Sequence, residues 1–185
     1  MTLYRASVAI VAGALTWSFL EYVIHRWLGH DARFRATPFG REHVRHHAEG
    51  NYFASSWKKA AVAVAVVALL LGPALAFGGD AGVAYVLSFV LGYGAYELVH
   101  RRLHVSAGFG AYGRWSRRHH FTHHFVDARF NHGVTSPLWD LVFGTHRRVA
   151  RITVPGKLCM SWLRDPSTGL VRGDWADTFE LRNPR

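Results

Sequence analysis

The chain has a single cysteine, Cys159, among its 185 residues. One thiol cannot form an internal disulfide, a CxxC redox pair, a CxxCH haem attachment or a thiolate-rich metal site. We therefore expect any metal that this protein binds to be held by nitrogen.

Acidic residues are scarce, since 12 Asp and Glu stand against 22 Lys and Arg, which gives a formal net charge of +10. In a soluble protein such an excess would suggest nucleic acid. No recognised nucleic-acid-binding module accompanies the charge, so we expect no nucleic-acid partner. The basic surface is expected to lie on anionic lipid headgroups.

Charge is absent from residues 60–79 (AAVAVAVVALLLGPALAFGG). At ~1.5 Å per residue, a helix of this length just crosses a hydrocarbon core of ~30 Å. Residues 3–24 and 82–99 are also apolar, and each has one acid near its C-terminal end, Glu21 and Glu97. We predict an all-α fold: an integral membrane helical bundle of three to four spans with a cytoplasmic, histidine-rich helical cap.

The distribution of Lys and Arg predicts the orientation of these spans. Of the 22 such residues, only Arg5 precedes the first span, none lies in the turn at 78–82, seven lie within 25–59 and fourteen follow His100. The positive-inside rule then places the N-terminus outside and the histidine groups on the cytoplasmic face. In a bacterium this would be the inner membrane.

Histidine is the residue present in excess, and ten of the thirteen copies fall into four spaced groups. Imidazole is the commonest metal ligand in proteins and suits iron, copper, zinc and nickel. One ion cannot use ten ligands, but two ions can. The candidate ligands are His25 and His30; His43, His46 and His47; His100 and His104; and His120, His123 and His124.

Helical spacing gathers the ligands within each group. Because residues three and four apart share a helix face, each HxxHH motif is expected to present three imidazoles to one side, and HxxxH two. His25 and His30 are five apart, which on a continuous helix separates them by roughly 140°. Gly29 offers an explanation, since it can end the helix and let His30 turn back.

The arrangement also repeats, because each of two apolar spans ends in a glutamate and a histidine and is followed by an HxxHH motif. We expect two half-sites that meet at the cytoplasmic face and enclose two metals. Glu21 lies four residues before His25, and Glu97 three before His100. Each carboxylate is expected to accept a proton from its imidazole and so fix the ring. The alternative is an acid that reaches the interface or pairs with an arginine.

In this order the motifs resemble the membrane fatty acid hydroxylase and sterol desaturase superfamily of histidine-rich di-metal oxygenases. The resemblance covers about residues 20–146. It is carried by HRWLGH (25–30), HVRHH (43–47), HRRLH (100–104) and HFTHH (120–124), then by NHGVTSPLWD (131–140) and FGT (143–145), which is similar to the family segment NxGxxxxxWDxxFGT.

The resemblance implies a di-iron centre that uses O2 and two electrons to hydroxylate or desaturate a C–H bond of a membrane lipid, with a fatty acyl chain favoured. The ten grouped histidines would be the ligands, zinc being the alternative ion in recombinant protein. Asp140 and Asn131 would support the site, together with Glu21 and Glu97. The electrons would come from a separate donor protein of cytochrome or ferredoxin type.

The resemblance further implies that residues 1–150 are the membrane-embedded catalytic domain. Residues 151–185 carry no family motif and are expected to be a C-terminal tail or soluble cap. An in-plane helix around residues 125–145 is expected to complete the enclosure. Structural or surface roles are preferred for the three remaining histidines, His119, His132 and His146.

Two other functions remain open. A carotenoid ring or sterol hydroxylase would have similar histidine groups, although the HxxxH at 100–104 and the 131–140 segment favour the fatty acid branch. From another class, a membrane metal transporter or metal-binding protein would also be rich in histidine. Transporters, however, place their ligands near the middle of the membrane in broken helices, whereas these ligands lie at span ends.

Overall fold

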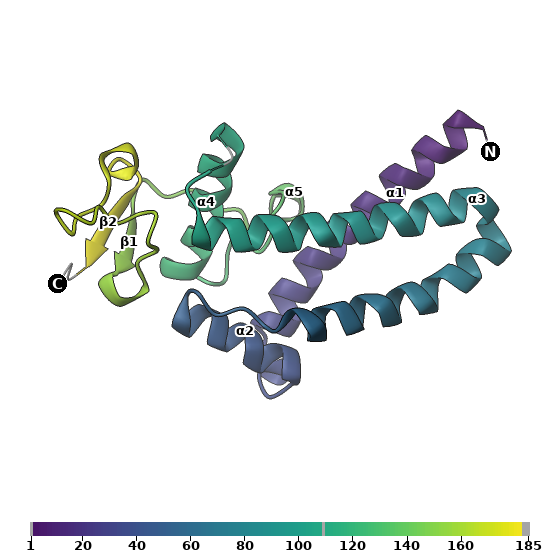
Figure 1. The fold of residues 1–185 in the computed structure, drawn as a ribbon, viewed down its shortest axis with the longest axis horizontal. Coiled ribbons are helices and arrows are strands. Elements are labelled where there is room, and N and C mark those ends of the chain that lie inside the picture. The colour runs from purple at the N-terminus through teal and green to yellow at the C-terminus, as the bar shows by residue number, and fades with distance from the viewer. Residues whose placement is uncertain (1, 109, 183–185) are drawn as a thin grey trace. The chain divides into compact units, whose positions relative to one another are not determined.

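The computed structural model describes residues 2–108 and 110–182, and most of them are helical (Figure 1). A two-stranded sheet departs from the all-α prediction. The chain divides into two compact units, one within Met1–Glu21 and Ala54–Glu97 and the other within Tyr22–Phe53 and Leu98–Arg185. The principal elements are α1 (Leu3–Val23), a π-helix (Ile24–Gly29), α2 (Pro38–Glu49), α3 (Ser56–Val105), α4 (Gly110–Phe125), α5 (Leu138–Val142), β1 (Ile152–Pro155) and β2 (Phe179–Arg182). Short 3-10 helices cover Ala32–Phe34, Gly156–Leu158 and Gly173–Trp175.

In the first unit, α3 is two helical legs joined at a sharp turn, as Figure 1 shows. Gly79 has φ 52° and ψ −133°, a conformation that is outside the helical region and that side-chain-bearing residues rarely adopt. Gly82 lies so close to the carbonyl of Ala74 that a Cβ atom would not fit. The predicted turn at 78–82 is therefore the place where the chain reverses.

Among the described residues, two helices are long and apolar enough to cross a membrane, Leu3–Gly29 and Ser56–Val105. The second contains the turn at Gly79. Its leg up to that turn, 56–78, would rise about 35 Å at ~1.5 Å per residue, which exceeds a hydrocarbon core of ~30 Å. The prediction of three or more spans stays a prediction.

The first helix packs on the second leg of α3 through one aromatic side chain. Trp17 lies edge-on to Tyr93 and Phe89, with ring centroids 5.0 and 5.6 Å apart. A Cβ atom on Gly92 would come within 2.9 Å of Trp17 Cδ1. A small residue is therefore needed here for the two helices to approach closely.

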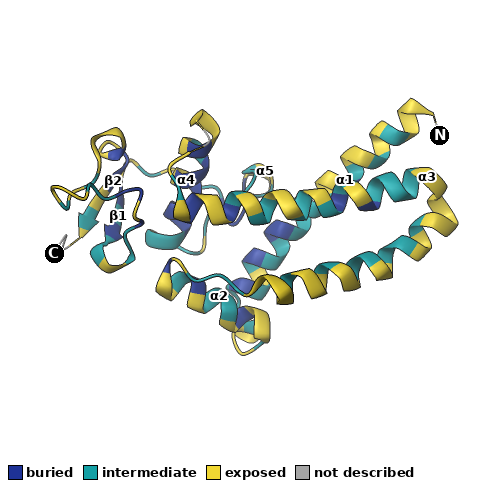
Figure 2. Ribbon diagram, in the orientation of Figure 1, coloured by how far each residue is buried: buried dark blue, intermediate teal, exposed yellow. Residues whose placement is uncertain are grey.

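The outward faces of this unit are apolar and exposed (Figure 2). Phe77 is 92% exposed, Leu69 73% and Leu91 72%. Soluble monomers rarely expose contiguous apolar surface on this scale, whereas helices in lipid need it. This surface and the helix lengths fit a membrane-embedded unit.

In the second unit, α2 and α4 carry the two HxxHH motifs. Thr37 begins α2, since its hydroxyl accepts from the amide of Gly40 at 3.1 Å and Pro38 occupies the first turn. Gly50 ends the helix with φ 68°. Helix α4 has buried side chains on most of its circumference (Figure 2), which makes it the centre of this unit.

The expected in-plane helix over 125–145 is wrong. Helix α4 ends at Phe125, and within this stretch only the five residues of α5 are helical again. Asn131 adopts a left-handed backbone with φ 59°, which interrupts a helix. The segment forms a tight loop instead, in which Gly133 lies so close to the carbonyl of Ser136 that a Cβ atom would not fit.

Residues 151–182 pack onto α4. Strands β1 and β2 pair in parallel, with Ile152 opposite Phe179. Their inward side chains and the segment between them form a core with Phe121 of α4, and the partly buried Phe125 of α4 packs against it. The buried members are Phe121, Ile152, Val154, Met160, Trp162, Leu163, Trp175 and Phe179.

We expect Ile152→Ala to destabilise the protein by about 2–5 kcal/mol, because it leaves a cavity in this core. Ile152 is completely buried. The matched control is Leu170→Ala, since Leu170 is 57% exposed. Thermal unfolding in detergent measures both, and equal midpoints for the two variants would contradict the packing described here.

Candidate metal centre

The second unit gathers the ten grouped histidines into two groups of five. Within each group, one ring nitrogen from every residue lies within 4.8 Å of the others. We name them the first and second histidine groups. The first consists of His25, His30, His43, His47 and His123, and the second of His46, His100, His104, His120 and His124.

In each HxxHH motif, the middle histidine belongs to a different group from the other two. In α2, His43 and His47 join the first group but His46 joins the second. In α4, the middle residue His123 joins the first group and its two neighbours in the motif join the second. Positions i and i+4 point nearly the same way, whereas i+3 is offset by roughly 60° from i and 100° from i+4. The expectation that each motif presents three imidazoles to one half-site is therefore wrong.

A π-helical turn brings His25 and His30 together. Residues Ile24–Gly29 form the π-helix, which has more residues per turn than an α-helix, so side chains five apart diverge less in direction. His30 follows directly, and its ring centroid lies 5.3 Å from that of His25. The helix ends at Gly29, as expected, although this glycine does not have a positive φ. Gly29 also allows close packing, because a Cβ atom there would lie 2.9 Å from Cδ2 of His43.

Facing ring nitrogens lie at distances that suit a shared metal ion. The Nε2 atoms of His30 and His43 are 2.8 Å apart, and those of His104 and His120 are also 2.8 Å apart. Two nitrogens at right angles on an ion, each at ~2.0–2.1 Å, would lie about 3 Å apart. The observed spacing fits such an ion.

Several buried ring nitrogens of the groups have no hydrogen-bond partner among the described residues. The nitrogens without a partner are Nε2 of His25, His47 and His123 and both ring nitrogens of His124. A buried polar atom without a partner costs free energy. An ion bound by these atoms would remove that cost, so the residues present fit a metal.

Backbone carbonyls hold three of the rings in position. Nδ1 of His46 donates to Tyr52 O and Nδ1 of His123 to Phe130 O, both at 2.7 Å, and Nδ1 of His25 donates to His132 O. A neutral imidazole that donates from Nδ1 presents its lone pair on Nε2. These three rings therefore offer Nε2 to the groups.

Burial keeps six of the grouped imidazoles neutral, which is the form that binds metal. Burial lowers the pKa of His30 to about 4. Burial and then repulsion from neighbouring rings hold the pKa well below its usual range in His43, His47, His120, His123 and His124.

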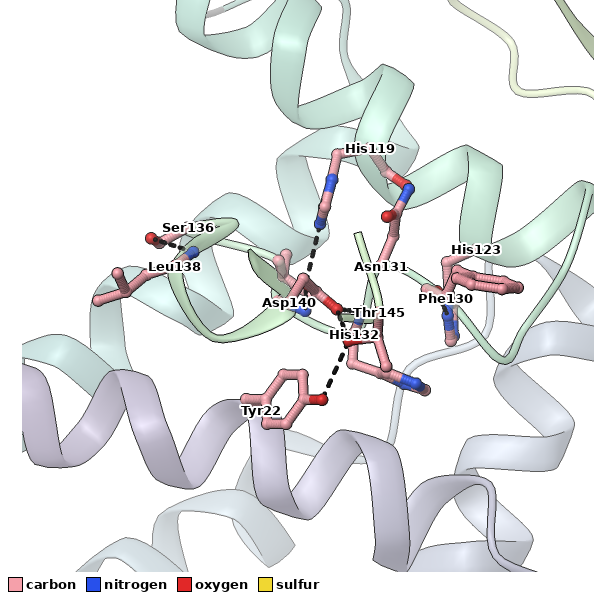
Figure 3. Close-up of polar contacts among 12 residues, drawn as sticks. Tyr22, His119, His123, Phe130, Asn131, His132, Ser136, Leu138, Asp140 and Thr145 are labelled. Atoms are coloured by element: carbon pink, nitrogen blue, oxygen red, sulfur yellow. Dashed lines mark hydrogen bonds and ion pairs between the residues drawn. The ribbon is translucent and has the colours of Figure 1, made fainter. Parts of the chain in front are cut away.

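Asp140 organises the loop beside the first group (Figure 3). Its carboxylate accepts from the amides of His132 at 2.9 Å and Gly133 at 2.8 Å, and from the Thr145 hydroxyl at 2.7 Å. His119 Nε2 lies 3.1 Å from it. Burial raises the pKa of this carboxyl, but the hydrogen bonds outweigh burial and lower the pKa below its usual value. Asp140 therefore stays ionised.

Asn131 supports the same loop from its other side. Its side-chain NH2 donates to His119 O and Arg147 O at 3.2 and 2.9 Å, and its carbonyl accepts from Arg147 N at 2.7 Å. The adjacent carbonyls of Phe130 and His132 receive ligand rings. Asp140 and Asn131 thus act on the site through the backbone of this loop.

Each of the two glutamates was expected to orient one histidine. Glu97 pairs with Lys59 Nζ at 2.5 Å, and Glu21 is buried. His25 takes a carbonyl of His132 as its acceptor where a carboxylate was expected. A role for Glu97 in orienting His100 stays a prediction.

Arg117 is a supporting residue that the motifs did not indicate. It is completely buried and donates to the carbonyls of Arg102 at 3.2 Å and of Ser106, at the end of the helix that carries His100 and His104. Its guanidinium lies 5.0 Å from the ring centroid of Trp162, whose Nε1 donates to His104 O at 3.0 Å. The C-terminal segment therefore helps to hold the second group.

The fold and the site define a class of protein. It is helical, it has an apolar helical hairpin, and one of its units gathers ten imidazoles into two groups, each small enough to bind one metal ion. The fatty acid hydroxylase family model matches residues 10–145, and the chain belongs to this family. The predicted resemblance is confirmed.

Curated relatives share the greater part of this chain. It is 28% identical to a dihydroceramide fatty acyl 2-hydroxylase of Arabidopsis thaliana, over 78% of this chain and 63% of that protein. It is 31% identical to the ceramide very long chain fatty acid hydroxylase scs7 of Schizosaccharomyces pombe, over 75% and 43%. The chain therefore spans less than two thirds of the length of these relatives.

A solved structure is also similar. It is described as full-length scs7p with only the hydroxylase domain visible, and it matches with a TM-score of 0.64 and 26% identity. The match covers 80% of this chain and 58% of the other.

We expect Gly29→Ala to lower the metal affinity of the first group by about tenfold or more, because the added Cβ displaces the His43 ring. Gly94→Ala is the matched control, since nothing lies within 4 Å of a Cβ there. Metal titration of detergent-solubilised protein measures both. Equal affinities in the two variants would contradict the close contact.

Proposed function

We propose that this protein is an O2-dependent di-iron hydroxylase of the membrane that adds a hydroxyl group to carbon 2 of a fatty acyl chain in a ceramide-type lipid. The observation that carries the proposal is the pair of five-histidine groups in a chain of the fatty acid hydroxylase family. The names of the relatives, which specify acyl 2-hydroxylation and ceramide, support the position and the substrate.

Each histidine group would hold one iron ion through its five imidazoles. When bound, the iron pair supplies O2 activation, by which a C–H bond, O2, two electrons and two protons give C–OH and water. Neutral nitrogen ligands suit iron, whereas magnesium prefers oxygen ligands, which these groups do not supply. The single cysteine leaves no thiolate set in competition.

The chain itself holds the ligands still and keeps water out. The carbonyls of Tyr52, Phe130 and His132 orient three rings, and Asp140 and Asn131 hold the loop that bears two of these carbonyls. Burial of the rings limits access by water, which would otherwise quench the oxidant.

Membrane placement brings the substrate to the site. The exposed apolar faces of α1 and α3 would lie in lipid, with the histidine motifs on the cytoplasmic face and the N-terminus outside. A cytochrome- or ferredoxin-type protein would supply the two electrons.

Expression under 18O2 followed by lipid mass spectrometry tests the reaction. We expect a 2-hydroxy acyl lipid that carries one 18O atom with the intact protein. His46→Ala should lower this product by about 100-fold or more, because it removes a ligand. Leu170→Ala, which changes an exposed side chain outside both groups, should retain it.

A lipid that loses two hydrogens and gains no oxygen would instead make the protein a desaturase. A labelled carotenoid or sterol would move it to the other hydroxylase branch. Metal uptake into vesicles without any oxidised lipid would favour the transporter.

Because each HxxHH motif is divided between the two groups, we can predict which double variants keep one ion. His43→Ala/His47→Ala removes two ligands of the first group only, so bound iron should fall from two ions to one. His43→Ala/His46→Ala removes one ligand from each group and should weaken both ions. Iron per protein, measured by elemental mass spectrometry during titration, distinguishes the patterns. Identical loss of a single ion in both variants would show that the motifs are not divided between the groups.

A further inference from the structure

A cavity of about 430 Å³ lies between α4 and the segments at 146–149 and 174–178. It is separate from both histidine groups. Helix α4 lines the cavity with positions 114, 115, 118, 119 and 122. At 100° per residue these positions form one face, and His120 and His124 lie on the opposite face. The basic residues in its lining are Arg114, Arg118, Arg147, Arg148, His119 and His146.

Within the described residues, two of these arginines donate hydrogen bonds to backbone carbonyls and not to carboxylates. Arg114 Nη1 donates to Asp174 O at 3.3 Å, and Arg118 Nη2 to Ala150 O at 2.8 Å. Carbonyls accept a hydrogen bond but do not cancel a charge. Each guanidinium has five N–H donors, so most of their donors stay available to a ligand.

The acids near the cavity cancel only part of this charge. The Asp174 carboxylate lies 3.6 Å from Nε of Arg172, which does not line the cavity. Asp127 neutralises Arg147 at 3.1 Å but also binds Arg129. Against four arginines, the lining contains two acids, Asp174 and Asp177. The cavity is therefore positively charged.

A rigid aromatic wall accompanies the charge. The rings of Trp115 and His119 stack with centroids 5.3 Å apart, and His146 stacks on His119 at the same distance. Asp140 holds His119 from the protein side. Nδ1 of His146 is buried and has no partner among the described residues.

We propose that this cavity binds a phosphate group, carried by a soluble phosphate ester or by a lipid headgroup. Arginine forks match the oxygens of a phosphate in pairs. The volume lies in the range of small-molecule sites, so part of the molecule that carries the phosphate also fits. This site goes beyond the proposed hydroxylation and uses neither histidine group.

Titration calorimetry of the full-length protein in a neutral detergent tests the site with two probes. Glycerol 3-phosphate represents a soluble ester, and phosphatidic acid in mixed micelles represents a headgroup, with phosphatidylcholine as the blank. Arg118→Gln/Arg148→Gln should weaken binding of the preferred probe by about tenfold or more. Arg148→Gln alone should weaken it by about threefold, without loss of the Arg118 contact to Ala150.

The charge-matched control is Arg33→Gln/Lys157→Gln, which removes two exposed positive charges outside the cavity. It should bind within about twofold of the unmodified protein. Tighter binding of glycerol 3-phosphate identifies a soluble ligand, and tighter binding of phosphatidic acid a headgroup. The proposal is overturned if neither probe binds, if the control loses as much affinity, or if the two arginine variants bind both probes unchanged.

Discussion

The packing of ten imidazole rings against one another, six of them buried and four partly buried, is the constraint on which the rest of the structure depends. A charged ring would lose its hydration and repel its neighbours, so the pKa values of His120, His123 and His124 are held well below the usual range and these rings are neutral. Each neutral ring then has one N–H to satisfy and one lone pair to use. Where the structure gives the acceptor for Nδ1, it is a backbone carbonyl, and Nε2 is left for a cation.

This demand accounts for the irregular backbone of the second unit. Carbonyls inside a regular helix are already paired, so free carbonyls must come from loops. Tyr52 follows α2, while Phe130 and His132 lie in the loop that Asn131 bends with its left-handed backbone. Asp140 holds that loop by its amides. The π-helical turn solves a related problem, since its wider turn lets the rings of His25 and His30 lie close together.

Much of the site was predictable, because local spacing decides it. The ten candidate ligands and the two residues that support the loop, Asp140 and Asn131, follow from motifs in a fixed order, and the family was recognisable from them. The turn near Gly79 also follows from the two apolar stretches that flank it. The failed helix over 125–145 shows the limit: Asp140 accepts hydrogen bonds from the amides of His132 and Gly133, and Asn131 donates to His119 O and Arg147 O, so the segment forms a loop held by side chains.

The sequence by itself determined which residues are candidate ligands, because a helix face is a matter of spacing along one chain. Only the tertiary structure decided which ligands share a group. His46 and His123 change groups because α2 and α4 each present two directions, and the packing of other elements determines what lies in each. Arg117 and Trp162 could not be anticipated for the same reason, since their contacts join segments far apart in the chain.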